Sequence, residues 1–409
     1  MHTLKRPHYA WIICLAGALA FCASMGLVAN LFALFLPDII GEQGLTNAQG
    51  SWLTTTRSLF TLASMLVVNQ LCDRFGLRKV MTLGCGLTAV AYLLLSRAGS
   101  FAECCFSCAL LGIGYCFSGP VPVAMMLGRW FESRRSLALG LSSAGSGLVT
   151  IIAPPILTSV QSQFGLPISF LMLSALALAL CTTLWLLVRN SPEDISLSPY
   201  YEELPAQKAA PMRVAPSPMT PVQKGAVLLA SLLMAAPAGP GFSHVAVFFR
   251  SEGYGEMLVA TLISFLGFVL LVGKILCGQV YDRVGGRLGN YYTYGLLLAG
   301  HGLFLLAPMG YGWLAFLSIA VYGMGIPISS VSTAKWAADL NDETSYASAV
   351  RSINTAYSLG TLVFGPVPGM LADRFGSYLP TYILFGLLLV VSLVILHVIY
   401  GQLGVGKRC

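Results

Sequence analysis

The sequence predicts an all-α membrane protein with twelve transmembrane helices arranged in two pseudo-symmetric six-helix bundles. Hydrophobic residues make up 56% of the 409-residue chain and charged residues only 10%, and the mean hydropathy is +0.77. A soluble domain of this size cannot bury so much apolar surface. Long apolar runs give the number of helices, and motifs that repeat in the second half of the chain indicate two bundles.

Each predicted helix is long enough to cross a bilayer, whose hydrocarbon core of about 30 Å requires about 20 apolar residues. Strands are excluded, because the runs are far longer than the roughly ten residues of a barrel strand and an open sheet edge cannot be satisfied in lipid. The predicted segments are 9–36, 48–72, 79–97, 101–128, 136–163, 167–189, 222–249, 256–281, 288–307, 311–334, 344–371 and 378–401.

A polar, proline-rich stretch at 190–221 separates the first six segments from the last six. Such a composition is typical of a linker, so the predicted organisation is a bundle at 1–189, the linker, and a bundle at 222–409. Similar motifs recur at an offset of about 210 residues, which indicates an internal repeat. The pairs are 73–79 with 282–287, 112–115 with 323–326, and 154–165 with 365–376.

The distribution of basic residues predicts the orientation of the chain. With both termini and the linker on the cytoplasmic side, the outer loops hold only Arg97, Arg250 and Arg374 of the 23 Lys and Arg residues. This bias is the positive-inside pattern of membrane proteins. The net charge of +7 therefore orients the protein, and no binding of nucleic acid is expected.

No pattern of catalytic or metal-binding residues accompanies the apolar segments. The eleven cysteines are scattered through apolar stretches without the paired spacing of a zinc site. No nucleophile–base arrangement and no Gly-rich nucleotide-binding loop is present. We therefore expect neither an enzyme nor a bound metal or cofactor.

The loop "DRFGLRK" at 73–79, its echo "DRVGGR" at 282–287, and the six-plus-six plan resemble the major facilitator superfamily. The resemblance implies transport around a site near the bilayer midplane. It also implies that the loop residues latch the cytoplasmic side. Arg351 lies close in sequence to Asp342 and Glu343, and it is expected to form a salt bridge of this gate or to anchor its helix at the lipid interface. The predicted gating residues are Asp73, Arg74, Arg78, Asp282, Arg283 and Arg351.

The stretch "RWFESRRSLALGLSSAGSG" at 129–147 is similar to a motif of the monocarboxylate porters and the bacterial oxalate/formate exchangers. In those families the eighth helix carries a cation eight residues before the loop aspartate, and here that position is Lys274. The mammalian porters carry an aspartate four residues before this cation, where this chain has Leu270. A second central cation of the exchangers falls at Leu359. These departures favour a monocarboxylate and disfavour proton coupling through a carboxylate on segment 256–281.

Lys274 lies about 12 Å of helix before Asp282, at 1.5 Å per residue. A charge near the midplane costs roughly 3 kcal/mol on insertion scales, and it is therefore seldom placed there without a function. No predicted segment carries a carboxylate at a comparable depth. The unpaired cation indicates an anionic substrate, although a neutral lysine or one bonded to backbone carbonyls is the structural alternative.

Other polar residues at the expected depth are weaker candidates for contact with the substrate. His244 follows a Pro/Gly-broken stretch and could contact a proton or substrate, or could only pack. Related bacterial porters hold the carboxylate with tyrosines on the fourth and tenth helices, which implies a role for Tyr115 and Tyr322. Arg57 could attract anions or anchor its helix at the interface. The remaining candidates are Tyr357, Asn354 and Asn30.

The predicted function is secondary active transport of a small monocarboxylate such as lactate or pyruvate, by alternating access around Lys274. The alternatives are a nitrate-type inorganic-anion porter and an oxalate/formate-type exchanger. Drug efflux and a nontransporting membrane sensor are more remote. The expected partners are the carboxylate, a coupled proton and the lipid bilayer. We expect a monomer in the bacterial cytoplasmic (inner) membrane.

Overall fold

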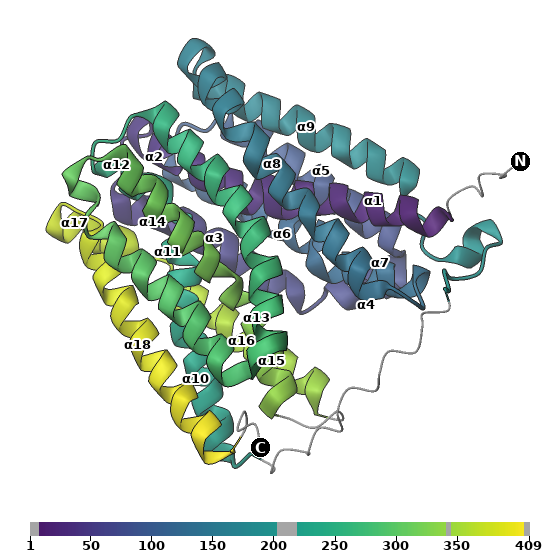
Figure 1. The fold of residues 1–409 in the computed structure, drawn as a ribbon. Coiled ribbons are helices and arrows are strands. Elements are labelled where there is room, and N and C mark those ends of the chain that lie inside the picture. The colour runs from purple at the N-terminus through teal and green to yellow at the C-terminus, as the bar shows by residue number, and fades with distance from the viewer. Residues whose placement is uncertain (1–7, 203–218, 341–344, 405–409) are drawn as a thin grey trace, which may run out of the picture. The chain divides into compact units, whose positions relative to one another are not determined.

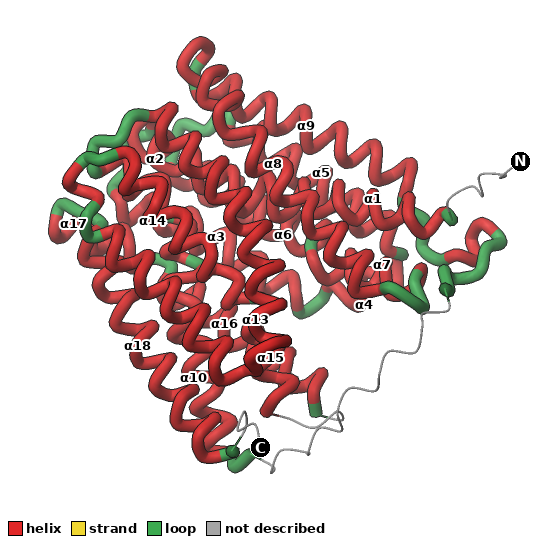
Figure 2. The backbone as a smooth tube through the Cα atoms, in the orientation of Figure 1, coloured by secondary structure: helices red, strands yellow, loops and turns green. Residues whose placement is uncertain are grey.

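The computed structural model describes residues 8–202, 219–340 and 345–404. Within these ranges the regular elements are helices, as Figure 2 shows, apart from one isolated bridge between Phe131 and Tyr200. The all-α prediction is therefore confirmed for the part of the chain that is described. Figure 1 labels the helices in the order in which the chain forms them.

Each of the twelve predicted segments is mostly helical where the structure describes it, with short turns inside or at the ends of several of them. The elements of residues 8–202 are α1 (Tyr9–Phe21), a π-helical stretch η1 (Cys22–Leu31), α2 (Phe32–Glu42), α3 (Asn47–Met65), α4 (Val68–Phe75), α5 (Leu77–Leu95), α6 (Phe101–Ser118), α7 (Pro120–Trp130), α8 (Arg135–Phe164), α9 (Leu166–Leu187) and η2 (Pro192–Ile195). Those that follow are α10 (Pro221–Ala238), α11 (Pro240–Ser243), α12 (Val245–Ser251), α13 (Glu256–Phe304), η3 (Ala307–Met309), α14 (Gly312–Gly325), η4 (Ile326–Ser329), α15 (Val331–Leu340), α16 (Tyr346–Phe364), α17 (Val367–Phe375) and α18 (Leu379–Gln402).

The lengths and hydropathies of these helices agree with a polytopic membrane protein. Nine stretches of the described chain are long and apolar enough to cross a bilayer. One of them, Glu256–Met309, contains two predicted segments, because α13 turns sharply at Gly285, where φ is +81°. The predicted segments 48–72 and 344–371 are helical but broken into shorter pieces. This pattern is consistent with twelve crossings.

Contacts within the chain define two compact units. Unit 1 comprises residues 1–32 and 59–211, and unit 2 comprises residues 33–58 and 212–409. Helix α2 and the first part of α3 therefore pack with the second half of the sequence. The boundary between the units falls inside α3, after Ser58. The two units are defined by packing contacts. The predicted division into two bundles at the 190–221 linker is defined by the sequence repeat, and it stays a prediction.

Small residues allow the helices of each unit to approach closely. In unit 1, a Cβ added at Gly145 of α8 would lie 2.1 Å from the carbonyl oxygen of Ala18 in α1. In unit 2, a Cβ at Gly300 of α13 would lie 2.6 Å from the Cα of Tyr322 in α14. Helices in lipid gain stability from such close packing, because no difference in hydrophobicity drives them together.

Several of the membrane-spanning segments are interrupted near their middle. Gly119 and Pro120 separate α6 from α7, and Pro237 with Pro240 accompanies the break between α10 and α11. The turn at η4 contains Pro327, which has no N–H to continue α14. In transporters, discontinuous helices of this kind build substrate sites, because they free polar backbone groups inside the membrane.

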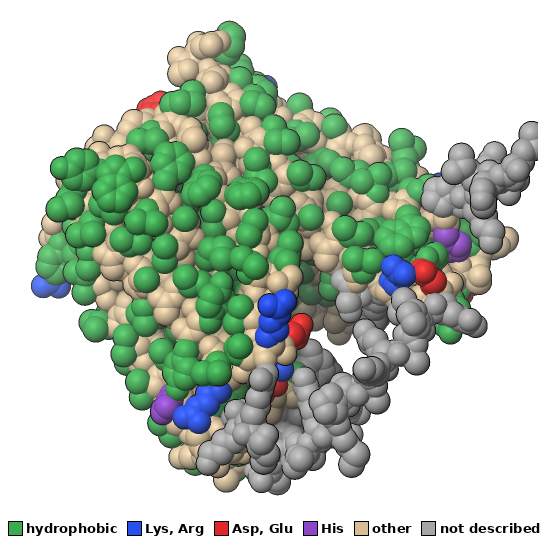
Figure 3. Space-filling model, in the orientation of Figure 1, with side chains coloured by type: hydrophobic (Ala, Val, Ile, Leu, Met, Phe, Trp, Pro, Cys, Tyr) green, Lys and Arg blue, Asp and Glu red, His purple; other side chains and the backbone are tan. Residues whose placement is uncertain are grey.

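The face of unit 2 formed by α13, α14 and α18 carries mostly hydrophobic side chains, as Figure 3 shows. Exposed apolar side chains of these three helices include Phe268, Leu317, Leu387 and Val394. An apolar surface of this kind matches contact with lipid hydrocarbon. The membrane assignment therefore rests on the outward side chains as well as on helix length.

The first part of the linker is held against unit 1. Arg134 precedes α8 in a left-handed conformation, with φ of +57°. Its guanidinium forms a two-point contact with the Glu202 carboxylate, Nε to Oε2 at 2.7 Å and a terminal nitrogen to Oε1 at 2.8 Å. The Tyr200 hydroxyl donates to Glu202 at 2.8 Å, and this hydrogen bond raises the pKa of the Tyr200 phenol. The first part of the polar, proline-rich linker, as far as Glu202, is therefore bound to the start of α8.

Candidate functional site

Lys274 lies on α13 in unit 2, with a half-buried side chain. Within the described residues no hydrogen bond or ion pair reaches its ammonium. The neighbouring Gly273 packs against α14, and a Cβ there would lie 3.2 Å from the Cα of Met324. The helix that carries Lys274 is thus fixed beside the break of α14 at η4.

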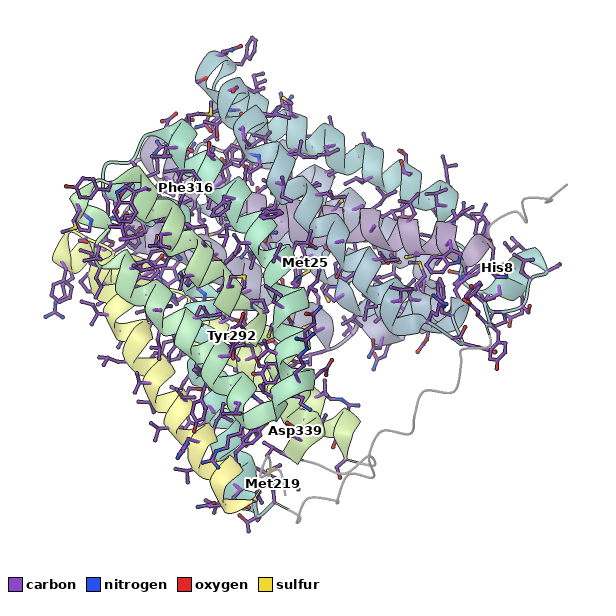
Figure 4. The ribbon with its side chains drawn as sticks, viewed as in Figure 1. His8, Met25, Met219, Tyr292, Phe316 and Asp339 are labelled. Carbon is purple, nitrogen blue, oxygen red and sulfur yellow. The ribbon has the colours of Figure 1, made fainter. Side chains whose placement is uncertain are left out.

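A second lysine of unit 2 differs from Lys274 in having a carboxylate partner. Lys335 lies on α15, and its Nζ is 2.8 Å from Oδ1 of Asp339, the aspartate labelled in Figure 4. Both side chains are largely buried, at 18% and 9% exposure. The contrast makes Lys274 the better candidate for binding an anion, because Lys335 already has one.

His244 lies between α11 and α12 and is 1% exposed. Its Nδ1 is 2.8 Å from the Pro240 carbonyl oxygen, and its Nε2 is 2.8 Å from Oγ of Ser51. A carbonyl only accepts, so Nδ1 carries the hydrogen in the neutral ring and Nε2 accepts from Ser51. Both ring nitrogens are therefore used by the protein, which supports the packing alternative.

Tyr322 is fully buried on α14, and its hydroxyl donates to the Pro237 carbonyl oxygen at 2.8 Å. Pro237 lies at the end of α10, where the break toward α11 leaves carbonyls without helical partners. The Tyr322 hydroxyl thus stabilises the break between α10 and α11 by hydrogen-bonding one of these carbonyls. In the conformation described, its hydroxyl is engaged by the protein rather than presented to a substrate.

The other predicted substrate residues fall in two groups. In unit 1, the Asn30 amide donates to Oγ1 of Thr150 at 2.7 Å, and Tyr115 is half-buried one turn before the α6–α7 break. In unit 2, Arg57 and Tyr357 are half-buried and Asn354 is exposed on α16. Tyr115 and Asn30 both belong to unit 1, and Arg57 and Lys274 both belong to unit 2.

The loop of unit 1 at 73–79 is attached to neighbouring helices by one ion pair and by contacts with aromatic rings. Asp73 pairs with Arg129 at 3.3 Å, and both side chains are substantially exposed. The Arg78 guanidinium lies 4.1 Å above the Trp185 ring, and its Nε donates to the Trp185 carbonyl at 2.7 Å. Arg74 lies over the Phe75 ring at 5.4 Å. These contacts are structural facts, and the gating role of the three residues stays a prediction.

The predicted gating residues of unit 2 lie on α13 and α16. Asp282, Arg283 and Arg351 all have exposed side chains. The partners predicted for Arg351, Asp342 and Glu343, lie outside the described residues. The gate that was expected from these residues therefore stays a prediction.

A group of residues that carried no predicted role surrounds the start of α3. The Asp373 carboxylate accepts hydrogen bonds from Asn47 and Ala48, and Ser51 accepts one from the Gly369 N–H. The sequence signal was present, because Asp373 belongs to the repeat unit 365–376. Its contact with α3 could not be predicted, since the two segments are more than 300 residues apart.

Comparisons with known proteins agree with this fold. The family model of the Major Facilitator Superfamily matches residues 13–354. Monocarboxylate transporter 12 of Mus musculus is 25% identical, covering 95% of this chain and 85% of its own length. Monocarboxylate transporter 4 of Gallus gallus is 24% identical, over 89% and 77%.

Two solved structures show the same fold at low sequence identity. A D-xylose-proton symporter has a TM-score of 0.69 and 14% identity, covering 95% of this chain and 97% of its own. The nucleoside transporter NupG has a TM-score of 0.72 and 11% identity, over 95% and 98%. These likenesses concern the architecture alone.

Proposed function

Because the chain belongs to the major facilitator superfamily, we propose that it transports a small monocarboxylate, such as lactate or pyruvate, by alternating access around Lys274. The membrane separates two compartments, and the gradients of the substrate and of any coupled ion or exchanged anion across it supply the driving force. The relatives named monocarboxylate transporters support the substrate class. The proposed position in the cell is the bacterial cytoplasmic membrane, with both termini and the linker inside.

The observation that carries the proposal is the unpartnered ammonium of Lys274 within the described residues. A cation deep in a membrane protein requires compensation. A carboxylate that enters from water provides it through a charge-assisted hydrogen bond, which is roughly twice as strong as a neutral one. A single central cation fits one carboxylate, and Leu359 provides no charge at the position where the exchangers carry a second cation.

In a proton-coupled cycle, no carboxylate beside Lys274 on α13 would carry the proton, because the residue one turn before Lys274 is Leu270. The remaining groups that could accept a proton are Lys274, the substrate carboxylate and His244. Of these, His244 is already engaged by Ser51 and Pro240. The proposal therefore places any proton with the substrate or with Lys274 first.

The test is uptake of labelled anions into proteoliposomes that contain the purified full-length protein. Lactate, pyruvate, oxalate, formate and nitrate are compared with and without a pH gradient, and protein-free liposomes are the control. Uptake of lactate or pyruvate that the unlabelled compound suppresses supports the proposal. Selective uptake of nitrate or oxalate would replace it with an inorganic-anion porter or a dicarboxylate exchanger, respectively.

A further inference from the structure

A polar contact lies on the mostly apolar face of unit 2 that α13 and α18 help to form. The Tyr291 hydroxyl is hydrogen-bonded to Nδ1 of His397, and the two rings lie 5.9 Å apart. Both side chains are exposed. With the phenol as donor, the neutral imidazole carries its hydrogen on Nε2. This N–H is free to donate to an acceptor outside the protein.

Arg287 lies four residues before Tyr291 on α13, so the two side chains are neighbours on one side of the helix. Its side chain is half-buried, and within the described residues no hydrogen bond, ion pair or ring contact reaches the guanidinium. We call Arg287, Tyr291 and His397 the α13–α18 site. It combines one permanent positive charge with hydrogen-bond donors, which is the chemistry that binds a phosphate.

The internal repeat places Arg287 at the position of Arg78 in unit 1. The loops at 73–79 and 282–287 align these two arginines. Each follows, by two residues, a glycine with positive φ, at +86° in unit 1 and +81° in unit 2. The backbone therefore turns into the following helix in the same way in both units, and the two side chains start from equivalent positions.

The two arginines differ in what covers them. The Arg78 guanidinium lies 4.1 Å above the Trp185 ring of α9, and its Nε donates to the Trp185 carbonyl oxygen at 2.7 Å. The repeat aligns Trp185 with Leu396 of α18, at an offset of 211 residues (365 against 154), and Leu396 is buried and has no aromatic ring. The protein thus satisfies Arg78 internally and leaves Arg287 without an equivalent partner.

The depth of the α13–α18 site is that of the boundary between hydrocarbon and headgroups. Tyr291 is six residues beyond the Gly285 turn, and His397 is five residues before α18 ends at Gln402. At 1.5 Å per residue, both lie about 8–9 Å from these helix ends. The headgroup layer adds about 5–8 Å on each side of the hydrocarbon core. A lipid phosphate is therefore within reach of Arg287, because long basic side chains extend toward the headgroups.

The surroundings of the site suit an occupant with apolar chains. Exposed apolar residues beside it on α13 and α18 include Leu288, Val394 and Val398. Figure 3 shows a histidine beside a Lys or Arg side chain toward the end of α18, on a face that is otherwise mostly hydrophobic. A phospholipid can place its phosphate on the polar groups and its acyl chains on the apolar ones, whereas a free anion contacts only the first.

The charges around the site favour an anionic headgroup over a zwitterionic one. The site contains no carboxylate that would bind the ammonium of a zwitterionic lipid. Of the nearby carboxylates, Asp282 lies in the exposed turn, and Asp339 is already 2.8 Å from Nζ of Lys335. In the predicted orientation this end of unit 2 meets the cytoplasmic leaflet, whose surface potential is negative because it holds anionic lipids.

We propose that the α13–α18 site binds the phosphate of an anionic phospholipid. Arg287 supplies the charge, Tyr291 orients the imidazole, and Nε2 of His397 donates a hydrogen bond. The acyl chains lie along Leu288 and Val394. This inference goes beyond the proposed function, because neither Lys274 nor a transported substrate takes part in it.

The test is a titration of the purified full-length protein in detergent, followed by native mass spectrometry. The lipids are phosphatidylglycerol and phosphatidylcholine with the same acyl chains. The parent should bind the first phosphatidylglycerol more tightly than phosphatidylcholine. Arg287→Gln should weaken the first phosphatidylglycerol by about tenfold, since it removes a charge-assisted hydrogen bond. Arg287→Lys keeps the charge without the planar fork and should fall between the two.

Lys79→Gln is the matched control, because it removes one exposed charge from the first turn of α5, beside the counterpart of Arg287. Its affinity for phosphatidylglycerol should stay at the parent value. Tyr291→Phe removes one neutral hydrogen bond and should weaken binding by about two- to threefold. This second variant keeps the test decisive where Arg287→Gln does not fold.

Three results would overturn the lipid site. The first is an equal affinity of the parent for the two lipids. The second is an equal loss in Lys79→Gln and Arg287→Gln, which would reduce the effect to general attraction between charges. The third is an equal affinity for soluble glycerol 3-phosphate, which would show that acyl chains take no part. Since transport does not enter this experiment, loss of the lipid site leaves the proposed function standing, and the reverse also holds.

Discussion

Ser51 donates its hydroxyl hydrogen to Nε2 of His244 over 2.8 Å, and the same oxygen accepts the Gly369 N–H at 2.8 Å. One hydroxyl thus joins α3, the α11–α12 junction and α17 within unit 2. Protonation of His244 would place a hydrogen on Nε2 and make the ring a donor on both sides. Ser51 would then have to turn its own hydrogen elsewhere, so the charged ring weakens this junction.

Replacing His244 by Gln should leave the response of transport to pH unchanged, because the ring is buried and both of its nitrogens are bonded as in the neutral form, so that its protonation is disfavoured. The measurement is the initial rate of lactate uptake between about pH 5.5 and about pH 8, the range in which an exposed histidine titrates. The parent and His244→Gln should show the same profile. A flatter profile in His244→Gln would show that this histidine is protonated during transport.

Replacing Lys274 by Gln should weaken binding of the substrate by about 10- to 100-fold, since a charge-assisted hydrogen bond contributes on the order of 1.5–3 kcal/mol. Thermal stability in detergent should hold or rise, because an uncompensated charge is removed. Lys274→Arg should retain part of the function at an altered geometry. The measurement is the Kd for lactate and pyruvate, together with Tm.

The control for this prediction is Lys335→Gln, which removes a lysine that is already paired with Asp339. It should lower stability by leaving Asp339 unpaired, and the affinity of the surviving protein should stay within about twofold of the parent. If Lys274→Gln behaves in the same way as Lys335→Gln, the substrate role of Lys274 is lost.

The Tyr322→Phe variant distinguishes a structural role of this tyrosine from a role in binding the substrate. The change removes the hydrogen bond to the Pro237 carbonyl and leaves that oxygen buried without this partner. We expect a loss of about 1–3 kcal/mol in stability with an unchanged Kd for lactate. The reverse result, unchanged Tm with a weaker Kd, would return the tyrosine to the binding site. Tyr115→Phe, on helix α6 of unit 1, is the comparison.

Glu202→Gln should loosen the docked part of the linker. It weakens the two-point contact with Arg134, which holds an unfavourable left-handed backbone. Because this pair is partly exposed, the expected effect is small, about a threefold faster cleavage of the 190–221 linker in limited proteolysis. Glu193→Gln removes an exposed charge from η2 and should cleave at the parent rate. Equal rates in all three proteins would show that the contact does not restrain the linker.

The orientation predicted from charge can be tested directly. A reporter that is active only in the cytoplasm, fused after Cys409, should be active in a bacterial host, and one fused within the 190–221 linker should be active as well. A reporter placed in the loop at 97–100 should be inactive. An active reporter in that loop, together with an inactive reporter after Cys409, would show that the topology is the opposite of the predicted one.

The amino-acid sequence is enough to assign the membrane class, the helical segments and the family. These follow from local quantities: apolar runs of bilayer length, the 190–221 linker, and the repeated loops at 73–79 and 282–287. It also singled out Lys274, because a charge within an apolar helix is visible without knowing what that helix touches.

The sequence does not show which polar side chains already have hydrogen-bond partners, because packing between helices supplies those partners. His244 and Tyr322 look alike in sequence as candidates for substrate contact, yet each is buried and bonded to a proline carbonyl of its own unit. The contact between Asp373 and Asn47 joins positions 326 residues apart. A hydrogen bond is satisfied or left open by what packing brings within about 3 Å. Sequence spacing carries no information about that distance once the two residues lie on different helices.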